Sequence, residues 1–160
     1  MKLLSSLCAL LSRTALVVAG TALAGLGLVV IYGVVMRYVF NHAPAFVEQV
    51  ALLLVICVAM FGASVGVRET GHIGLDSLVK RLPPGGQRAV ELLGDLLVLG
   101  FAVVLVWGSL DMIDITRANS IPTLGISEAC RYTPPLVAGV LVGLFSIERL
   151  LSVFTTQEAR

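Results

Sequence analysis

The feature that most constrains this chain is an uncharged apolar run of 23 residues from Thr14 to Met36. As an α-helix rising about 1.5 Å per residue, the run is about 34 Å long, enough to cross a hydrocarbon core of about 30 Å. In water, a helix without a polar face would expose apolar side chains all round. The run therefore predicts a transmembrane helix over residues 14–36.

A secretory signal peptide is the competing interpretation of the same run. Lys2 gives a positive N-terminal region, and Ala22-Leu23-Ala24 resembles a cleavage site. However, Arg13 would interrupt the apolar region of such a peptide, and apolar sequence continues for twelve residues beyond Ala24. We therefore expect a retained spanning helix.

The composition of the whole chain agrees with a membrane protein. Of its 160 residues, 58% are hydrophobic and 13% are charged, whereas soluble domains have about 45–50% apolar and about 25% charged residues. With 11 Lys and Arg against 10 Asp and Glu, the chain has no basic surface for nucleic acid. Its three cysteines stand in separate segments, which argues against a disulfide framework or a CxxC site.

Three more apolar stretches predict spans over residues 49–67, 92–114 and 132–152. The uncharged part of the third, Leu96 to Leu110, has only 15 residues. Its helix must therefore carry Asp95 and Asp111 to the membrane boundaries. We expect a single all-α domain over residues 1–160, with four transmembrane helices.

The basic residues predict the orientation of these helices. In a four-span topology, three basic residues lie on the side of the short loops, and eight lie on the side of the two termini: Lys2, Arg13, Arg68, Lys80, Arg81, Arg88, Arg149 and Arg160. Basic residues are enriched in cytoplasmic segments. We therefore expect a multi-pass membrane protein with both termini in the cytoplasm.

The connection between the second and third spans has the pattern of a short amphipathic helix over residues 72–82. At about 100° per residue, its leucines and Val79 share one face, and Asp76, Lys80 and Arg81 share the other. We expect this helix to lie in the membrane interface and to be ended by Pro83-Pro84-Gly85-Gly86, with the next helix running from about Arg88 to Thr116. The candidate lipid contacts are His72, Lys80, Arg81 and Arg88.

The sequence lacks the residues that several membrane chemistries require. The two histidines, His42 and His72, fall outside the spans on opposite sides, which argues against haem ligation. The sequence has no pair of thiols for disulfide exchange. It also has no ionisable group near the centre of a span, which is where a proton-coupled exporter would need one. We expect neither an enzyme nor a bound cofactor or metal.

The remaining candidates are charged residues at helix ends. Arg37 and Glu48 flank a short loop, where they either pair or anchor the helices in the interface. Asp114 and Arg117 have i,i+3 spacing, which fits a solvated pair or contacts to a water-side partner. The candidate contacts to other proteins are Arg37, Glu48, Asp95, Asp111, Asp114 and Arg117. Gly139 and Gly143 have the spacing that allows close helix packing, within the chain or with a partner.

Several short motifs in chain order resemble the small membrane subunit of tripartite ATP-independent periplasmic (TRAP) transporters, the DctQ-like family. The motifs are Arg37-Tyr38-Val39-Phe40-Asn41, Pro44 with Glu48, Gly62-Ala63, Arg68-x-x-x-His72-Ile73-x-x-Asp76, Leu82-Pro83-Pro84 and Ser120-x-Pro122-x-Leu124-Gly125-Ile126. The resemblance covers nearly the whole chain. It departs from the family at Phe46-Val47-Glu48-Gln49, where a tryptophan and two adjacent acids are usual and one acid is present.

The resemblance implies a four-helix subunit of the bacterial inner membrane that braces a large multi-span subunit and helps to dock a periplasmic substrate-binding protein. It implies that ion-gradient-driven uptake of organic acids takes place on the large subunit, which holds the sodium and substrate sites. Two other functions remain to be distinguished. A stand-alone exporter or channel-forming oligomer predicts transport by the purified chain, and an electron carrier predicts haem or flavin absorbance.

Overall fold

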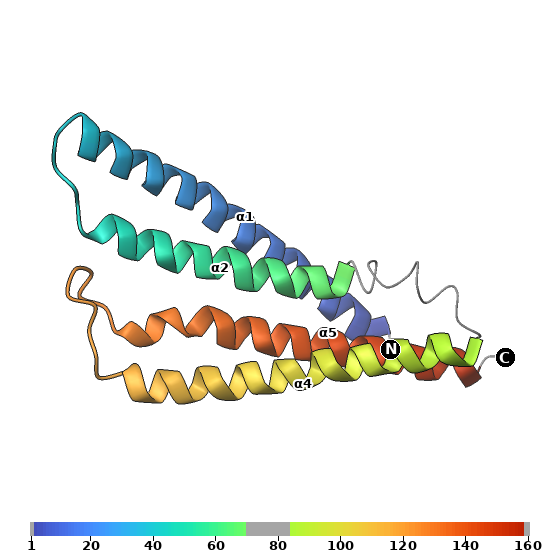
Figure 1. Cartoon of the computed structure of the whole chain (residues 1–160). Helices are drawn as coiled ribbons and strands as arrows, with labels where there is room; N and C mark the ends of the chain where they lie inside the picture. Colours follow the sequence, from blue (N-terminus) through green and yellow to red (C-terminus); the bar gives the residue numbers. More distant parts are fainter. Residues whose placement is uncertain (1, 70–83, 159–160) are drawn as a thin grey trace.

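The chain folds into four long helices in a computed structural model that describes residues 2–69 and 84–158. The helices are α1 (Lys2–Tyr38), α2 (Phe46–Glu69), α4 (Pro84–Thr116) and α5 (Thr133–Glu158), and a short 3-10 helix, η1 (Glu128–Arg131), precedes α5. Each of the four contains a segment long and apolar enough to cross a membrane. The predicted four-helix transmembrane architecture is thus confirmed (Figure 1).

The helices extend beyond the predicted spans. With 37 residues, α1 is about 55 Å long, well beyond the about 30 Å of a hydrocarbon core. The start of α4 differs from our expectation, because Pro84, Gly85 and Gly86 belong to the helix instead of turning the chain before Arg88. A proline in the first turn loses no hydrogen bond, since the first N–H groups of a helix have no partner within it.

Part of the predicted interfacial segment cannot be compared with the structure. The helix expected over residues 72–82, with His72, Lys80 and Arg81, lies outside the described residues. The backbone of Arg88 is in α4, and its side chain is outside the described part.

The four helices form two hairpins that lie side by side, α1 with α2 and α4 with α5 (Figure 1). Among the described residues, α5 packs against both α2 and α4, and it contacts α1 to a smaller extent. The share of buried residues reflects this central position: it is 39% in an apolar 18-residue window of Glu128–Leu151, against 11–17% in the corresponding windows of the other three spans. The second hairpin is therefore joined to the first through α5.

The tightest apolar packing lies toward the end of the molecule that carries the termini. Cys8 and Ala15 of α1, Val65 of α2, and Leu141 and Phe145 of α5 form one buried cluster. Away from this cluster, α1 diverges from the second hairpin (Figure 1). This cluster therefore fixes where α1, α2 and α5 meet.

Most of the large apolar side chains point outward. Leu28, Val104 and Trp107 are 70%, 68% and 75% exposed. In water, such a surface would drive aggregation. On helices of spanning length, it is the surface that lipid tails or another membrane protein cover.

Glycines permit close approach within each hairpin. A Cβ at Gly139 of α5 would lie 2.9 Å from Val106 Cγ2 of α4, and one at Gly33 of α1 would lie 2.7 Å from Val47 Cγ1 of α2. Real Cβ atoms essentially never approach so closely. Gly139, the first glycine of the predicted packing motif, therefore serves packing inside this chain.

Two ordered loops close the hairpins at the end opposite the termini. Asn41 has φ 50°, and the N–H of His42 bonds to the carbonyl of Met36, six residues earlier, at 3.0 Å. In the second loop, Gly125 has φ +66°, and the N–H groups of Leu124 and Gly125 both bond to the Ile121 carbonyl. The left-handed conformation explains why a glycine stands at position 125.

Candidate functional site

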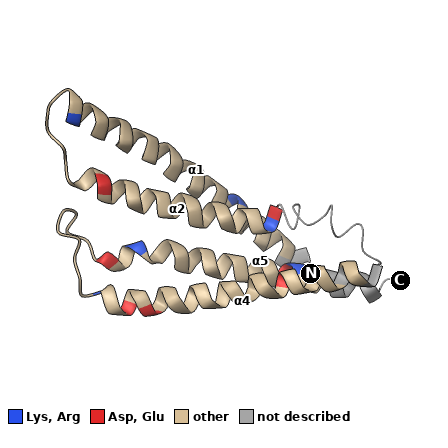
Figure 2. Ribbon diagram, in the orientation of Figure 1, with Lys and Arg blue, Asp and Glu red and all other residues tan. Residues whose placement is uncertain are grey.

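The charged residues gather at two ends of the helix bundle (Figure 2). We call the end that carries the termini the terminal end, and the end formed by residues 39–45 and 117–132 the loop end. Between them, the described helices are uncharged over their long middle parts (Figure 2). The charged side chains of the described helices therefore lie toward the two ends of the bundle and not in its middle.

At the terminal end, two ion pairs tie α5 to its neighbours on both sides. Arg68 Nε of α2 lies 3.5 Å from Glu148 Oε2, and Arg149 Nε lies 3.2 Å from Asp95 Oδ1 of α4. Glu148 and Arg149 are consecutive, so their side chains leave the helix about 100° apart and reach different neighbours. We call these two pairs the ionic clamp.

The two pairs of the clamp differ in burial. Asp95 is the more enclosed group, with 5% of its side chain exposed, while the Arg149 side chain is 34% exposed. The side chains of Arg68 and Glu148 are 25% and 20% exposed. Charge interactions strengthen as water is excluded, so we expect the pair of Asp95 and Arg149 to hold its helices more strongly.

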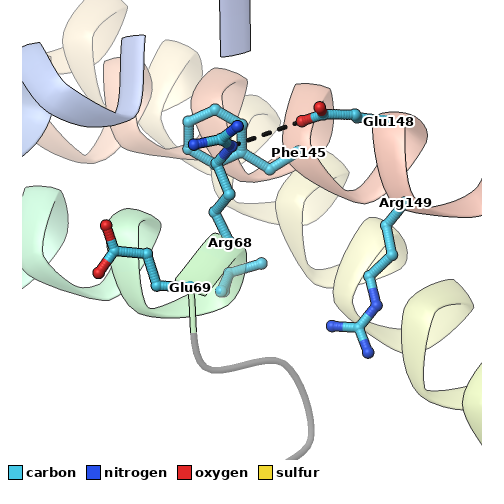
Figure 3. A pocket seen from close by; sticks show the side chains of 6 residues that line it. Arg68, Glu69, Phe145, Glu148 and Arg149 are labelled. Carbon is cyan, nitrogen blue, oxygen red and sulfur yellow. Dashed lines mark ion pairs between the residues drawn. The ribbon is translucent and has the colours of Figure 1, made fainter. Parts of the chain in front are cut away.

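Arg68 makes a second contact, with an aromatic ring. Its guanidinium carbon lies 5.7 Å from the ring centroid of Phe145, within the range of a cation–π interaction. Figure 3 shows the arginine reaching from α2 in front of this ring toward Glu148. Phe145 also belongs to the buried apolar cluster, so the clamp is continuous with the core.

A hollow of about 410 Å³ lies beside the clamp, between the ends of α2 and α5. Two arginines, two glutamates and two apolar side chains line it: Val67, Arg68, Glu69, Phe145, Glu148 and Arg149 (Figure 3). It is thus a charged opening at the end of two apolar spans.

At the loop end, Arg131 joins the second loop to the first hairpin. Its Nη1 lies 3.4 Å from Glu128 Oε1 within η1, and its Nη2 donates a hydrogen bond to Gln49 Oε1 near the start of α2. Ser127 caps η1 by accepting from the Ala129 N–H. These contacts hold the second loop against α2.

Arg37 and Glu48 come together without pairing. Both line a hollow of about 330 Å³ at the loop end, together with Tyr38 and Pro44. Among the described residues, the structure records no ion pair between them. Of the two predicted arrangements, the geometry is that of separate interfacial charges around a shared hollow.

Asp111, Asp114 and Arg117 lie exposed near the end of α4. Arg117 Nη1 is 3.5 Å from Asp114 Oδ1, and both side chains are more than 70% exposed. This is the predicted i,i+3 pair at a solvated helix end. Both charges remain accessible to a water-side partner.

Asp95, a predicted candidate contact to another protein, pairs with Arg149 of the same chain. Sequence reasoning also missed Gln49, Arg68 and Arg131 as contact-forming residues. Each of these residues has a complementary polar group at a similar depth on another helix. This pattern does not by itself say which helices are neighbours.

Comparisons with known proteins identify the family of the chain. Residues 26–156 match the model of the family described as tripartite ATP-independent periplasmic transporters, DctQ component. Two similar proteins of Haemophilus influenzae carry the name TRAP transporter small permease protein. One is 31% identical over 130 residues, covering 81% of each chain, and the other is 24% identical over 111 residues, covering 69% of this chain and 67% of the relative. The chain therefore belongs to the DctQ family and is a small permease subunit of a TRAP transporter.

Proposed function

We propose that this subunit is a rigid membrane frame that braces a large multi-span TRAP subunit. The ionic clamp is the observation that supports this role most directly, because it ties α5 to α2 and α4 at one depth. A subunit that holds its own helices in place gives a moving partner a fixed reference, as rigid-body transport mechanisms require.

The large subunit carries the sodium and substrate sites in this proposal, and organic acids are its substrates. Supporting this division of labour, the middle of each described helix is free of charged side chains (Figure 2). An ion or carboxylate passing through this chain alone would meet no charged group there. The same feature weighs against a stand-alone exporter and against a catalytic role.

We propose that both termini lie in the cytoplasm and the loop end faces the periplasm, in the bacterial inner membrane. The support is the excess of Lys and Arg on the side of the termini. Cys130 is an exposed thiol at the loop end, whereas Cys8 is buried near the other end. A membrane-impermeant maleimide added to intact spheroplasts should therefore label wild type and not Cys130→Ser. Labelling of Cys130 only after permeabilisation would reverse the orientation.

The exposed charges of the loop end are proposed to help dock the periplasmic binding protein. Arg37 and Asp114 lie on different hairpins, so variants of these two residues test both halves of the loop end. Charges at the rim of an interface steer association and make it depend on salt.

The test is binding of the substrate-binding protein to the purified membrane complex, with uptake of labelled organic acids measured in parallel. Arg37→Ala and Asp114→Ala are expected to slow association several-fold at low salt and to flatten its salt dependence. Arg13→Ala removes an exposed arginine toward the opposite end and is the matched control. Unchanged affinity and uptake in the two loop-end variants would contradict the docking role.

A further inference from the structure

An apolar furrow of about 490 Å³ runs along the second hairpin between α4 and α5, which lie side by side (Figure 1). Residues within 99–110 of α4 and 139–147 of α5 line it. Small residues allow the two helices to meet at its floor, where a Cβ at Gly143 would lie 3.8 Å from the Cβ of Ala102. Close contact between helix backbones leaves the larger side chains standing on either side.

Two rows of exposed apolar side chains form the walls of the furrow, one on each helix. Their members follow one another at intervals of four and three residues: Val103, Trp107 and Leu110 on α4, and Val140, Leu144 and Ile147 on α5. This is the spacing at which a helix presents side chains to a neighbour that crosses it at a small angle. The furrow therefore has the shape of a seat for one more helix.

Contacts at both ends hold the walls of the furrow in place. At the terminal end, Arg149 Nε of α5 lies 3.2 Å from Asp95 Oδ1 of α4. At the loop end, η1 leads into α5 and packs against α4. A surface that is already ordered loses less conformational freedom when a partner binds. The furrow is thus suited to a permanent neighbour.

The charge at the loop end of the furrow indicates the chemistry of this neighbour. Asp111 follows Trp107 by four residues, so the two side chains lie on the same side of α4. Arg117 pairs with Asp114, whereas Asp111 is exposed and has no ion pair among the residues that the structure describes. One negative charge is therefore left at this end, and it would repel the phosphate of a lipid placed there. A complementary neighbour is apolar along the furrow and basic at the depth of Asp111.

We propose that a transmembrane helix of the large TRAP subunit packs in this furrow and pairs a lysine or arginine with Asp111. The inference rests on the bracing role proposed above and assigns that role to one surface of the chain. The partner helix covers Trp107, whose side chain would otherwise be 75% exposed. It packs against α4 and α5 together, which the ionic clamp holds to α2.

The test compares how much large subunit accompanies the tagged full chain when it is purified from its native cells in mild detergent. Val103→Trp places a bulky side chain in the furrow and should lower the recovered large subunit several-fold per tagged chain. Val17→Trp is the matched control, because Val17 of α1 is 60% exposed and Val103 is 59% exposed. It should retain the large subunit. Equal recovery with both variants would overturn the assignment.

Charge reversal tests the predicted ion pair. Asp111→Lys should lower recovery of the large subunit several-fold, because two cations would then face each other in place of a complementary pair. Glu69→Lys changes an exposed acid of the first hairpin and should have no such effect. Full recovery with Asp111→Lys would refute the ion pair.

Photocrosslinking identifies the neighbour even if Val103→Trp does not fold. With p-benzoylphenylalanine at position 103, illumination of whole cells should give an adduct to an apolar peptide of the large subunit. Adducts only to lipid, or only to a second copy of this chain, would overturn the proposal.

The wild-type preparation separates this inference from the bracing role. If the large subunit accompanies wild type and is lost with Val17→Trp but not with Val103→Trp, the furrow assignment is wrong and the brace remains. Absence of a large subunit from the wild-type preparation would contradict both.

Discussion

Removing either partner of the pair formed by Asp95 and Arg149 should destabilise the bundle by unequal amounts. Arg149→Ala leaves the Asp95 carboxylate, whose side chain is 5% exposed, without its arginine. Breaking a buried pair in this way costs about 3–5 kcal/mol. Asp95→Ala leaves Arg149, whose side chain is already 34% exposed and can turn toward water. We therefore expect the free energy of unfolding to fall by about 1–2 kcal/mol, between the values for exposed and buried pairs.

The double variant sharpens this expectation. When both side chains are alanine, no charge remains buried at this depth, so the double variant should be more stable than Arg149→Ala alone. The corresponding coupling energy is about 2 kcal/mol, within the range found for residues in direct contact. Additive losses in the double variant would refute the reasoning.

The assay is reversible unfolding of the purified chain by sodium dodecyl sulfate in mixed micelles, followed by circular dichroism and by the fluorescence of Trp107, the sole tryptophan. Asp114→Ala and Arg117→Ala are the controls, because this pair is exposed and should contribute less than about 1 kcal/mol. The account of the clamp would be contradicted if Arg149→Ala cost no more than these controls, or less than Asp95→Ala.

Three further predictions concern packing and the loop end. Gly139→Ala should lower the free energy of unfolding by about 1–3 kcal/mol, since its methyl group would lie 2.9 Å from a side chain of α4. Gly143→Ala, where the nearest atom is 3.8 Å away, should be close to neutral in the same titration; equal losses would refute the packing argument. Gly125→Ala should cost about 1 kcal/mol because the residue has φ +66°, and a neutral result would show that the turn relaxes. Arg131→Ala should speed proteolysis in the second loop, because the hydrogen bond to Gln49 is lost; an unchanged cleavage rate would show that other contacts hold this loop.

The apolar runs predicted the helices because a spanning helix has a local signature. The central parts of all four spans lie within helices of the structure. The early start of α1 was missed because Ser5, Ser6, Ser12 and Arg13 interrupt the apolar run. The helix nevertheless continues through these residues. Ser12 is buried against the rest of the chain, with 2% of its surface exposed.

The candidate site was predicted less completely, because ion pairs depend on which helices are neighbours. Arg68 and Glu148 are 80 positions apart, and nothing in the local sequence places α5 between α2 and α4. The i,i+3 pair of Asp114 and Arg117 is local and was predictable. The role of Gly139 was open between packing within the chain and packing with a partner, and only the neighbouring helix decides it.

The central claim is that this chain works as a brace for a larger membrane subunit. The most direct measurement is purification of the tagged chain from its native cells in mild detergent, with mass spectrometry of the proteins that accompany it. The account predicts a large multi-span membrane protein in stoichiometric amount. Recovery of the chain alone or only with itself, together with transport by the purified chain in liposomes, would contradict it.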